Sequence, residues 1–276
     1  MLVFNGCNDK GEKIVPAALT GLSIASDSPG TITIRWSLPN NVESIRYIRV
    51  DYYDPRLKKD VLKTASVYSD SMVINDTRLK YGEYTFKVHT VSPSGEAGNV
   101  QELKIVSLPA EPTYIATIVP LTAGSFSTGM QSTAEGPVGN LADDAGTTYF
   151  HSDYSGSRPP APHWFQVNLG TDISSGYFRF WYQNRANANN KPTDFDLLGS
   201  TDAQSWFLIR NFTLEADGLN VANGGQWTSG NYAVPQPFRY LRFSVNQTNN
   251  NTDFFTMAVF KFYTVVLIDP EAPDSD

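Results

Sequence analysis

The sequence predicts an all-β protein built from two consecutive sandwich domains. In Thr31–Trp36, large apolar side chains alternate with polar ones, and the same period of two returns in Tyr84–His89 and, less regularly, in Ile45–Tyr53. Turns rich in proline, glycine and asparagine separate these runs, and no stretch has the 3.6-residue period of an amphipathic helix. At about 150 residues per domain, the 276 residues provide for two domains.

The composition argues against several classes of function. With 21 Lys or Arg and 28 Asp or Glu, the chain has a net charge of −7, which argues against nucleic acid or an anionic membrane surface as its partner. Its 13% of aromatic and 18% of charged residues are untypical of a disordered chain. No apolar run approaches the roughly 20 residues of a membrane-spanning helix, so we expect membrane attachment only through an anchor.

The first residues are similar to the end of a bacterial lipoprotein signal. In Leu2–Cys7 a small residue, Gly6, precedes the single cysteine, which would be the lipidated residue. The alternative is an incidental cysteine in an N-terminal stub. The apolar stretch is shorter than the roughly 7–15 residues of a signal peptide, which indicates an upstream start or a shortened chain. We predict a stub and tether over residues 1–14, lipidation of Cys7, and an outer-membrane lipoprotein of the bacterial cell envelope that faces the exterior or the periplasm.

A connector with two prolines, residues 109–112, divides the chain. Residues 1–108 hold 13 basic and 12 acidic side chains, whereas the later residues hold 8 and 16, and 26 of the 35 aromatic residues follow the boundary. Two prolines three residues apart make a short, stiff linker. The predicted domains are therefore 15–108 and 113–264, and the acid- and proline-rich end is predicted to form an acidic tail over 265–276.

The first domain resembles fibronectin type III and related immunoglobulin-like modules. The resemblance is carried by Trp36 in the second predicted strand and by Leu79–Phe86, which is similar to the run that contains the tyrosine corner of these modules. It implies a β-sandwich over residues 15–108. Because such modules are most often spacers, we expect this domain to present the second one.

The second domain resembles discoidin domains, also called F5/8 type C domains or family 32-like carbohydrate-binding modules. The resemblance spans nearly the whole domain and is carried by Asp143–Ser152, His163–Gly170, Pro192–Trp206, Phe238–Phe243 and Met257–Tyr263. It implies a jelly-roll β-sandwich over residues 113–264. The disulfide that usually ties the first and last strands of eukaryotic members is impossible with one cysteine, which favours a bacterial member. Three tryptophans that fall in strand patterns are expected in the core: Trp164, Trp181 and Trp206.

The resemblance also implies a structural calcium site beside one loop. Family members often hold calcium there, and Asp143 and Thr148 match two of the ligands. Calcium prefers about six to eight oxygen ligands, but Asp144 stands where glycine is usual and Val259 where a glutamate is usual. Two alternatives stay open: Asp143 and Thr148 bind calcium, or they only organise the loop by hydrogen bonding to backbone amides.

Ligand sites of this family lie on the loops at one end of the sandwich, and three loops here combine aromatic rings with polar side chains. A sugar needs directional hydrogen-bond partners for its hydroxyls and an aromatic platform for its apolar face. We predict Tyr154 as the platform and His151, Arg158 and Arg185 as hydrogen-bond donors, and Asn187 and Asn189 are further predicted ligand-binding residues. The third loop contributes Asn249, Asn250 and the pair Phe254–Phe255. Structural alternatives stay open: His151 as a loop brace, Arg185 as the partner of a surface acid, and the two phenylalanines as core residues.

The sequence thus predicts a non-catalytic, carbohydrate-binding surface lipoprotein of the glycan-utilisation type, whose ligand is a poly- or oligosaccharide. Only three histidines are present, His89, His151 and His163, and no spacing suggests a zinc site or a nucleophile elbow. No cofactor other than the calcium considered above is expected. Two alternatives remain: a module that docks a partner enzyme or transporter at the cell surface, and an accessory fragment of a glycoside hydrolase whose catalytic domain lies outside this chain.

Overall fold

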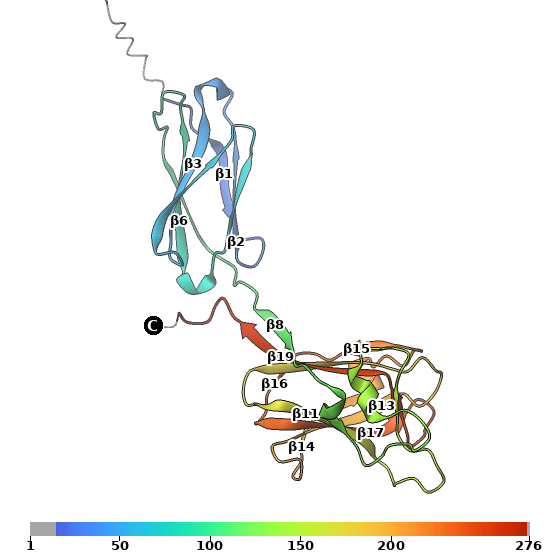
Figure 1. The fold of residues 1–276 in the computed structure, drawn as a ribbon. Helices are drawn as coiled ribbons and strands as arrows, with labels where there is room; N and C mark the ends of the chain where they lie inside the picture. The colour runs from blue at the N-terminus through green and yellow to red at the C-terminus, as the bar shows by residue number, and fades with distance from the viewer. Residues whose placement is uncertain (1–14, 275–276) are drawn as a thin grey trace, which may run out of the picture. The chain divides into compact units, whose positions relative to one another are not determined.

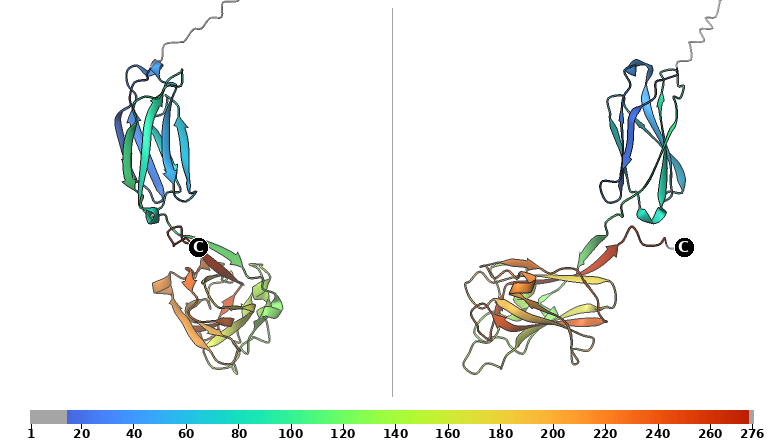
Figure 2. Two further views of the ribbon diagram at one scale, coloured as in Figure 1. Left: turned by 90° about the vertical axis from the view of Figure 1, so that its left-hand side faces the viewer. Right: turned by 180° about the vertical axis from the view of Figure 1, so that it is seen from behind.

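The computed structural model describes residues 15–274, which form two compact units (Figures 1 and 2). The first unit takes in the chain through Thr113 together with the segment from Asp269 onward, and the second comprises Tyr114–Ile268. Cys7 and the rest of the predicted tether lie outside the described residues. Within residues 15–274, no helix is long and apolar enough to cross a bilayer.

Strands dominate both units, and the predicted all-β fold is confirmed. The described residues include one α-helix, α1 (Leu214–Asp217), which is a single turn. The other helical elements are short 3-10 turns: η1 (Val42–Ser44), η2 (Leu79–Tyr81), η3 (Ala123–Ser125) and η4 (Val138–Ala142).

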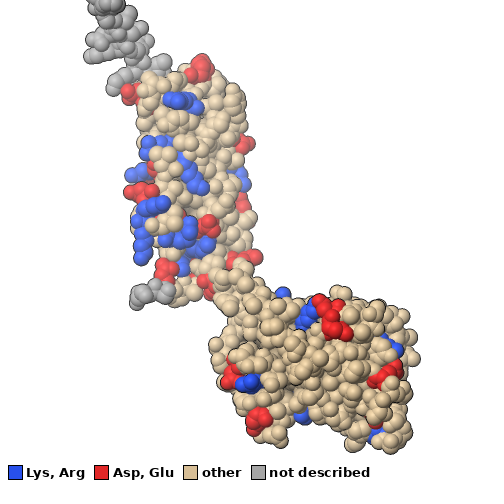
Figure 3. Space-filling view, viewed as in Figure 1, with Lys and Arg blue, Asp and Glu red and all other residues tan. Residues whose placement is uncertain are grey.

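The first unit is a sandwich of two antiparallel sheets, one with the strand order β1-β2-β5 and the other with the order β4-β3-β6-β7. Its strands are β1 (Thr20–Ala25), β2 (Thr31–Ser37), β3 (Tyr47–Asp54), β4 (Lys59–Ala65), β5 (Ser71–Asn75), β6 (Glu83–Val91) and β7 (Gln101–Val106). Ile32, Ile34 and Trp36 of β2 are buried in the core between the sheets, as their alternation predicts. In Figure 3, Lys and Arg side chains gather along one side of this unit, in keeping with its larger share of basic residues.

The tyrosine corner indicated by the sequence is present in the first unit. The hydroxyl of Tyr84 accepts a hydrogen bond from the backbone N–H of Arg78 at 2.9 Å, six residues upstream. Gly82, at φ 74° directly after η2, adopts the left-handed conformation that turns the chain into β6. Trp36 is buried, and its indole N–H donates to the Ser69 carbonyl at 2.8 Å. These contacts support the resemblance to a fibronectin-like sandwich.

The predicted acidic tail over residues 265–276 is wrong at its start, because β19 (Val259–Ile268) continues through residues 265–268. Val265 pairs with Tyr177 on the neighbouring strand, and the apolar composition of residues 265–268 favours a strand as well. The acidic part then packs on the first unit. The Glu271 carboxylate accepts hydrogen bonds from the backbone N–H groups of Leu79, Lys80 and Ala110 at 2.7–3.1 Å.

The second unit is also a sandwich of two five-stranded, largely antiparallel sheets. One has the order β14-β13-β17-β11-β9, and the other the order β15-β12-β19-β8, with β16 also paired to β12. A separate two-stranded pair, β10 with β18, lies beside them. The strands are β8 (Thr113–Ile118), β9 (Phe126–Ser127), β10 (Phe150–His151), β11 (His163–Ile173), β12 (Tyr177–Gln183), β13 (Pro192–Ser200), β14 (Phe207–Thr213), β15 (Gln226–Thr228), β16 (Tyr232–Ala233), β17 (Phe238–Thr248), β18 (Thr256–Met257) and β19.

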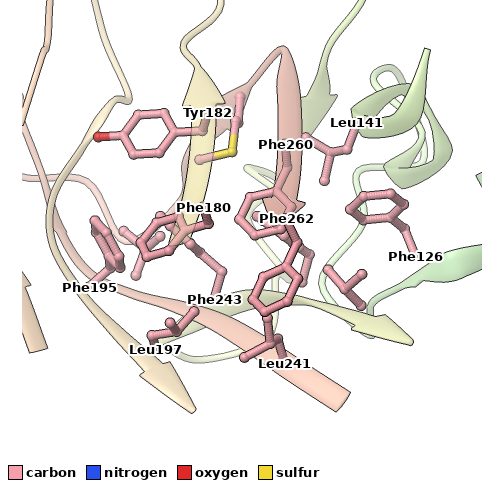
Figure 4. Packing of buried hydrophobic residues seen from close by; sticks show 14 of the residues in the cluster. Phe126, Leu141, Phe180, Tyr182, Phe195, Leu197, Leu241, Phe243, Phe260 and Phe262 are labelled. Carbon is pink, nitrogen blue, oxygen red and sulfur yellow. The ribbon is translucent and has the colours of Figure 1, made fainter. Parts of the chain in front are cut away.

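Phenylalanine rings fill the core of the second unit (Figure 4). Phe195 of β13 and Phe243 of β17 are stacked with ring centroids 4.0 Å apart, and Phe180 of β12 packs edge-on against Phe195 at 6.2 Å. All three are fully or almost fully buried. Burying a phenylalanine side chain stabilises a fold by about 1.5–3 kcal/mol, so this cluster provides the rigid support on which the loops are carried.

The predicted core position of the three tryptophans is wrong. Trp164 of β11 and Trp181 of β12 alternate with buried rings, so they lie on the outward faces of the sheets and are half-buried. The Arg242 guanidinium lies 4.0 Å from the ring centroid of Trp164 and 4.1 Å from that of Trp206. The Lys261 ammonium lies 4.8 Å from the ring centroid of Trp181. These rings therefore pack against cations rather than the hydrocarbon core.

Tyr182 carries a buried hydroxyl with no hydrogen-bond partner among the described residues. Figure 4 shows this hydroxyl directed away from Phe180 and Phe260. Burial raises the pKa of Tyr182, so the group stays neutral and its cost is that of an unpaired O–H. We expect Tyr182→Phe to raise the free energy of unfolding of the second unit by about 1 kcal/mol, because the shape of the ring is kept and the unpaired group is removed. Chemical denaturation measures this, and a loss of stability would contradict it.

Candidate functional site

Three aromatic rings meet in the two loops that flank the β10–β18 pair. His151 ends β10, Tyr154 follows three residues later, and Phe254 lies in the loop between β17 and β18. The ring centroids of His151 and Tyr154 are 4.8 Å apart, and Phe254 lies 6.0 Å from His151 and 6.1 Å from Tyr154. Tyr154 is 42% exposed, whereas His151 is 4% exposed. The tyrosine thus offers an accessible ring that packs against a buried histidine and a half-buried phenylalanine.

A second trio of side chains adjoins these rings. The Tyr149 hydroxyl donates a hydrogen bond to the Glu135 carboxylate, and the Arg185 guanidinium lies 3.4 Å from the Tyr149 ring centroid and 3.8 Å from that carboxylate. The hydrogen bond from Tyr149 lowers the pKa of Glu135 and outweighs the effect of burial, which raises it; the charge of Arg185 and a hydrogen bond from Tyr154 lower this pKa further. Because Glu135 interacts with both trios, we treat them as one site and call it the rim cluster: Glu135, Tyr149, His151, Tyr154, Arg185 and Phe254.

A close backbone approach holds Glu135 in place. Gly136 has a φ of 68°, and a Cβ atom at this position would lie 2.5 Å from the His151 backbone nitrogen. The His151 N–H donates to the Gly136 carbonyl at 3.0 Å, and the Ser132 N–H donates to the His151 carbonyl at 3.1 Å. Only glycine permits this contact, which lays the loop of residues 131–137 against β10 and brings Glu135 beside Tyr149.

The hydrogen bond of His151 fixes its tautomer. Its Nδ1 lies 2.7 Å from the Ser152 carbonyl oxygen, which can only accept, so Nδ1 carries the proton. Burial lowers the pKa of His151, which favours the neutral ring. Nε2 is then a hydrogen-bond acceptor, so the donor role predicted for His151 from the sequence is wrong: the Ser152 carbonyl takes the one N–H of the neutral ring. The histidine therefore braces its loop through one nitrogen and offers a lone pair through the other.

Arg158 braces the two loops that carry the rings. Its Nε donates to both oxygens of the Asp253 carboxylate at 2.9 and 3.0 Å, and its Nη1 donates to the Ser155 carbonyl at 3.0 Å. The guanidinium carbon lies 5.6 Å from the ring centroid of Phe254. The hydrogen bond from Arg158 lowers the pKa of Asp253. This arginine is therefore engaged with its neighbours at the edge of the rim cluster.

The structure brings together three of the residues predicted from the sequence, namely His151, Tyr154 and Arg185. Arg158 stands beside them as a brace. Asn187 is half-buried, and its backbone carbonyl oxygen accepts a hydrogen bond from Lys191, whereas Asn189 is exposed.

The sequence prediction missed Glu135 and Tyr149, and it left Phe254 open as a core residue. Phe254 is half-buried in the rim cluster, while Phe255 is a core residue with 0% exposure. The sequence signal for Phe254 was the pair Phe254–Phe255 within a polar loop. Nothing in the sequence around Glu135 marks it, because its neighbours in the cluster come from distant segments.

The rim cluster offers the chemistry that a neutral, hydroxyl-rich ligand requires. Arg185 is paired with Glu135, and Arg158 is paired with Asp253, so neither guanidinium leaves an excess of positive charge. An open polar hollow of about 700 Å³ also exists on this unit, lined by residues such as Thr193, but no aromatic ring lines it. Ring, acceptor and donor are combined at the rim cluster.

The loop that resembles a calcium site is closed by groups of the protein itself. The Thr148 hydroxyl donates to one oxygen of Asp143 at 2.6 Å, and the Ala145 N–H donates to the other at 2.9 Å. Asp144, at a φ of 57° where glycine is usual, pairs with the Lys261 ammonium at 2.6 Å. Both carboxylates therefore already have donors.

The remaining calcium ligand implied by the family is also missing. Val259 is 1% exposed in the core and carries no oxygen on its side chain. Among the described residues, no group of three or more His, Cys, Asp or Glu is placed to hold a metal ion. A lysine ammonium beside the loop repels a divalent cation. The residues present therefore do not fit calcium, and Asp143 and Thr148 serve to organise the loop.

We expect the thermal unfolding temperature to be the same in excess calcium and in a chelator, because Lys261 supplies the positive charge at this loop. Lys261→Met should lower the stability of the second unit by about 0.5–1 kcal/mol, since the ion pair is partly exposed. Differential scanning fluorimetry measures both effects. A rise of several degrees on adding calcium to the wild type would contradict the assignment.

The comparisons with known proteins agree with this fold. The family model described as the F5/8 type C domain matches residues 121–260. No curated protein sequence matches the chain.

Similar solved structures include the Clostridium perfringens module CpGH89CBM32-5 in complex with GalNAc-β-1,3-galactose, with 16% identity, a TM-score of 0.43, and coverage of 53% of this chain and 99% of that one. The family 32 module of NanJ from C. perfringens in complex with galactose has 18% identity and a TM-score of 0.42, over 54% and 99% of the two chains. A SusE-like protein, BT2857, has 14% identity and a TM-score of 0.39, over 90% and 97%.

The family match spans the second unit from the residues before η3 to the closing strand β19, and it covers half of the chain. The chain therefore belongs to the F5/8 type C domain family.

Proposed function

We propose that the chain is a non-catalytic binding protein that holds a neutral carbohydrate at the rim cluster. The observation that carries this proposal is an exposed tyrosine ring beside a histidine acceptor and an arginine–glutamate pair. A pyranose has an apolar face and a rim of hydroxyls, and it is complementary to such a set. Membership of the F5/8 type C family supports a binding role but does not decide the ligand, because one fold hosts several functions.

Five members of the cluster contact the sugar in this proposal, each in its own way. The exposed face of Tyr154 carries the apolar face of the sugar, and Phe254 extends that surface. The lone pair of His151 Nε2 accepts a hydrogen bond from one hydroxyl. Arg185 donates to a second hydroxyl, and Glu135 accepts from a third.

The charge of the cluster argues for a neutral rather than an acidic sugar. Both nearby guanidinium groups already face carboxylates, and Glu135 stays ionised at neutral pH because its pKa is lowered. A uronic acid or sulfated sugar would bring a further negative charge to this carboxylate. Desolvating two like charges costs several kcal/mol at a protein surface, so acidic glycans should be excluded.

Avidity fits the proposed location at the cell surface. A single shallow site binds a sugar at about millimolar dissociation constants, roughly −4 kcal/mol. Many copies anchored on one membrane would convert this weak affinity into retention of a polysaccharide. We include in the proposal the lipid anchor at Cys7, the first unit as a spacer, and the outer membrane of a bacterium as the location.

The proposal is tested by a glycan array followed by calorimetry on the hits. We expect binding to neutral oligosaccharides and no binding to their uronate or sulfated counterparts. Tyr154→Ala should weaken binding about tenfold, equivalent to about 1.4 kcal/mol, because the platform is lost. Tyr53→Ala, which removes a 54% exposed tyrosine of the first unit, is the control and should bind as the wild type does. Absence of binding to all glycans, with a folded protein, would refute the function.

The pH dependence of binding should follow His151. Burial lowers its pKa, so the neutral acceptor persists below the ordinary histidine value of about 6.5, and affinity is lost only as the pH falls further and Nε2 gains a proton. Calorimetry from pH 7.5 down to 4.5 measures this loss. His151→Gln, which keeps an acceptor and cannot titrate in this range, should flatten the profile. A wild-type affinity that rises on acidification would show that the imidazolium is the binding form.

A further inference from the structure

A lysine is buried without an acidic partner beside the rim cluster. Lys191 directly precedes β13 and is 0% exposed. None of the ion pairs among residues 15–274 involves it. Isolated buried charges are expensive, and they persist in folded proteins when polar groups of the fold hold them. The partners of this ammonium therefore indicate what it does.

Neutral oxygen atoms of two loops surround the Lys191 ammonium. Nζ donates to the backbone carbonyl of Asn187, and it lies 3.5 Å from the side-chain oxygen of the same residue. The side-chain oxygen of Asn223 is 3.4 Å away. An ammonium has three donors and no acceptor, so three oxygens match it. The lysine thus ties the loop of residues 184–191 to the loop of residues 220–225.

The same two loops hold Arg185 of the rim cluster. The Arg185 carbonyl accepts hydrogen bonds from the backbone N–H of Asn187 at 2.9 Å and of Gly224 at 3.3 Å. The Lys191 carbonyl accepts a hydrogen bond from the Asn249 backbone N–H at 2.9 Å, and the Lys191 N–H donates to the Asn249 side-chain oxygen at 3.0 Å. Asn249 begins the loop that leads to Phe254. Lys191 therefore links the segments that carry two members of the cluster.

We propose that Lys191 is a positioning residue of the rim cluster: its ammonium gathers the oxygens of Asn187 and Asn223, and this holds Arg185 over Tyr149 and beside Glu135. Burial lowers the pKa of Lys191, in keeping with a desolvated charge that has no carboxylate to offset it. Without the ammonium, these oxygens face one another with no donor between them, and the loop has to rearrange. The consequence for affinity rests on the proposed function, whereas the consequence for Arg185 does not.

The first test is Lys191→Met in the full chain, because methionine keeps the apolar stem and removes the charge. NMR of the Arg185 side chain reports its position directly, since a guanidinium stacked 3.4 Å from the Tyr149 ring centroid has proton resonances shifted upfield by the ring. We expect this shift to collapse in the variant and the affinity for the best neutral glycan to fall at least fivefold. Lys63→Met, at a half-buried lysine of the first unit, is the control and should change neither.

Asn223→Ala is the second variant, because it removes one oxygen from an exposed loop residue and leaves the buried lysine in place. It should shift the Arg185 resonances in the same direction by a smaller amount. Unchanged Arg185 resonances in both variants would overturn the proposal, and if Lys191→Met fails to fold, unchanged resonances in Asn223→Ala alone would do so. Collapse of the shift in a protein that binds no sugar even as wild type would sustain the positioning role and refute the proposed function.

Discussion

The candidate site depends on one short pairing, that of β10 with β18. It joins residues that lie more than a hundred positions apart, Phe150 with Met257 and His151 with Thr256, and side chains reinforce it. The Thr256 hydroxyl donates to the Phe150 carbonyl at 2.8 Å, and the Phe255 N–H donates to the Ser152 hydroxyl at 2.9 Å. Because Phe150 and Phe255 are fully buried, the pair is fixed to the ring-filled core. The two loops that leave this pair start side by side, and they place the rings of Tyr154 and Phe254 next to each other.

Electrostatic pairing gives the site its chemical character. One arginine lies in the rim cluster and another at its edge, and each is paired with a carboxylate from a different loop, so the two cations fix geometry as much as they offer hydrogen bonds. Ion pairs that are partly exposed contribute little to folding, about 0–1 kcal/mol each. They contribute mainly to orientation, since Arg158 joins the loops that carry the rings and the guanidinium of Arg185 lies over the Tyr149 ring. A site organised in this way is polar without being charged, which is the property that the proposed ligand class requires.

The sequence predicted what depends on local pattern and missed what depends on distant contacts. The alternation in β2, the run around Tyr84 and the segments similar to F5/8 type C domains led to the correct fold class, because strand period and turn chemistry are written in neighbouring residues. His151, Tyr154 and Arg185 were found because each stands in a loop of mixed composition or directly before one. Glu135 was not, because it reaches the site only through the close approach at Gly136. The early start of the predicted tail is an error of another kind, because residues 265–268 are an apolar run typical of a strand and the acidic, proline-rich residues begin only at Asp269.

The two lysines between residues 114 and 268 show a common principle of loop construction. Irregular loops gather carbonyl and carboxylate oxygens, and such gatherings need positive charge or donors to be stable. A metal ion is one solution, and an ammonium fixed by the fold is another. Lys261 occupies this role beside Asp144, and Lys191 occupies it beside Asn187 and Asn223. A covalently attached cation cannot be removed by a chelator or diluted away. Loops built in this way keep their shape whatever the metal content of the surroundings.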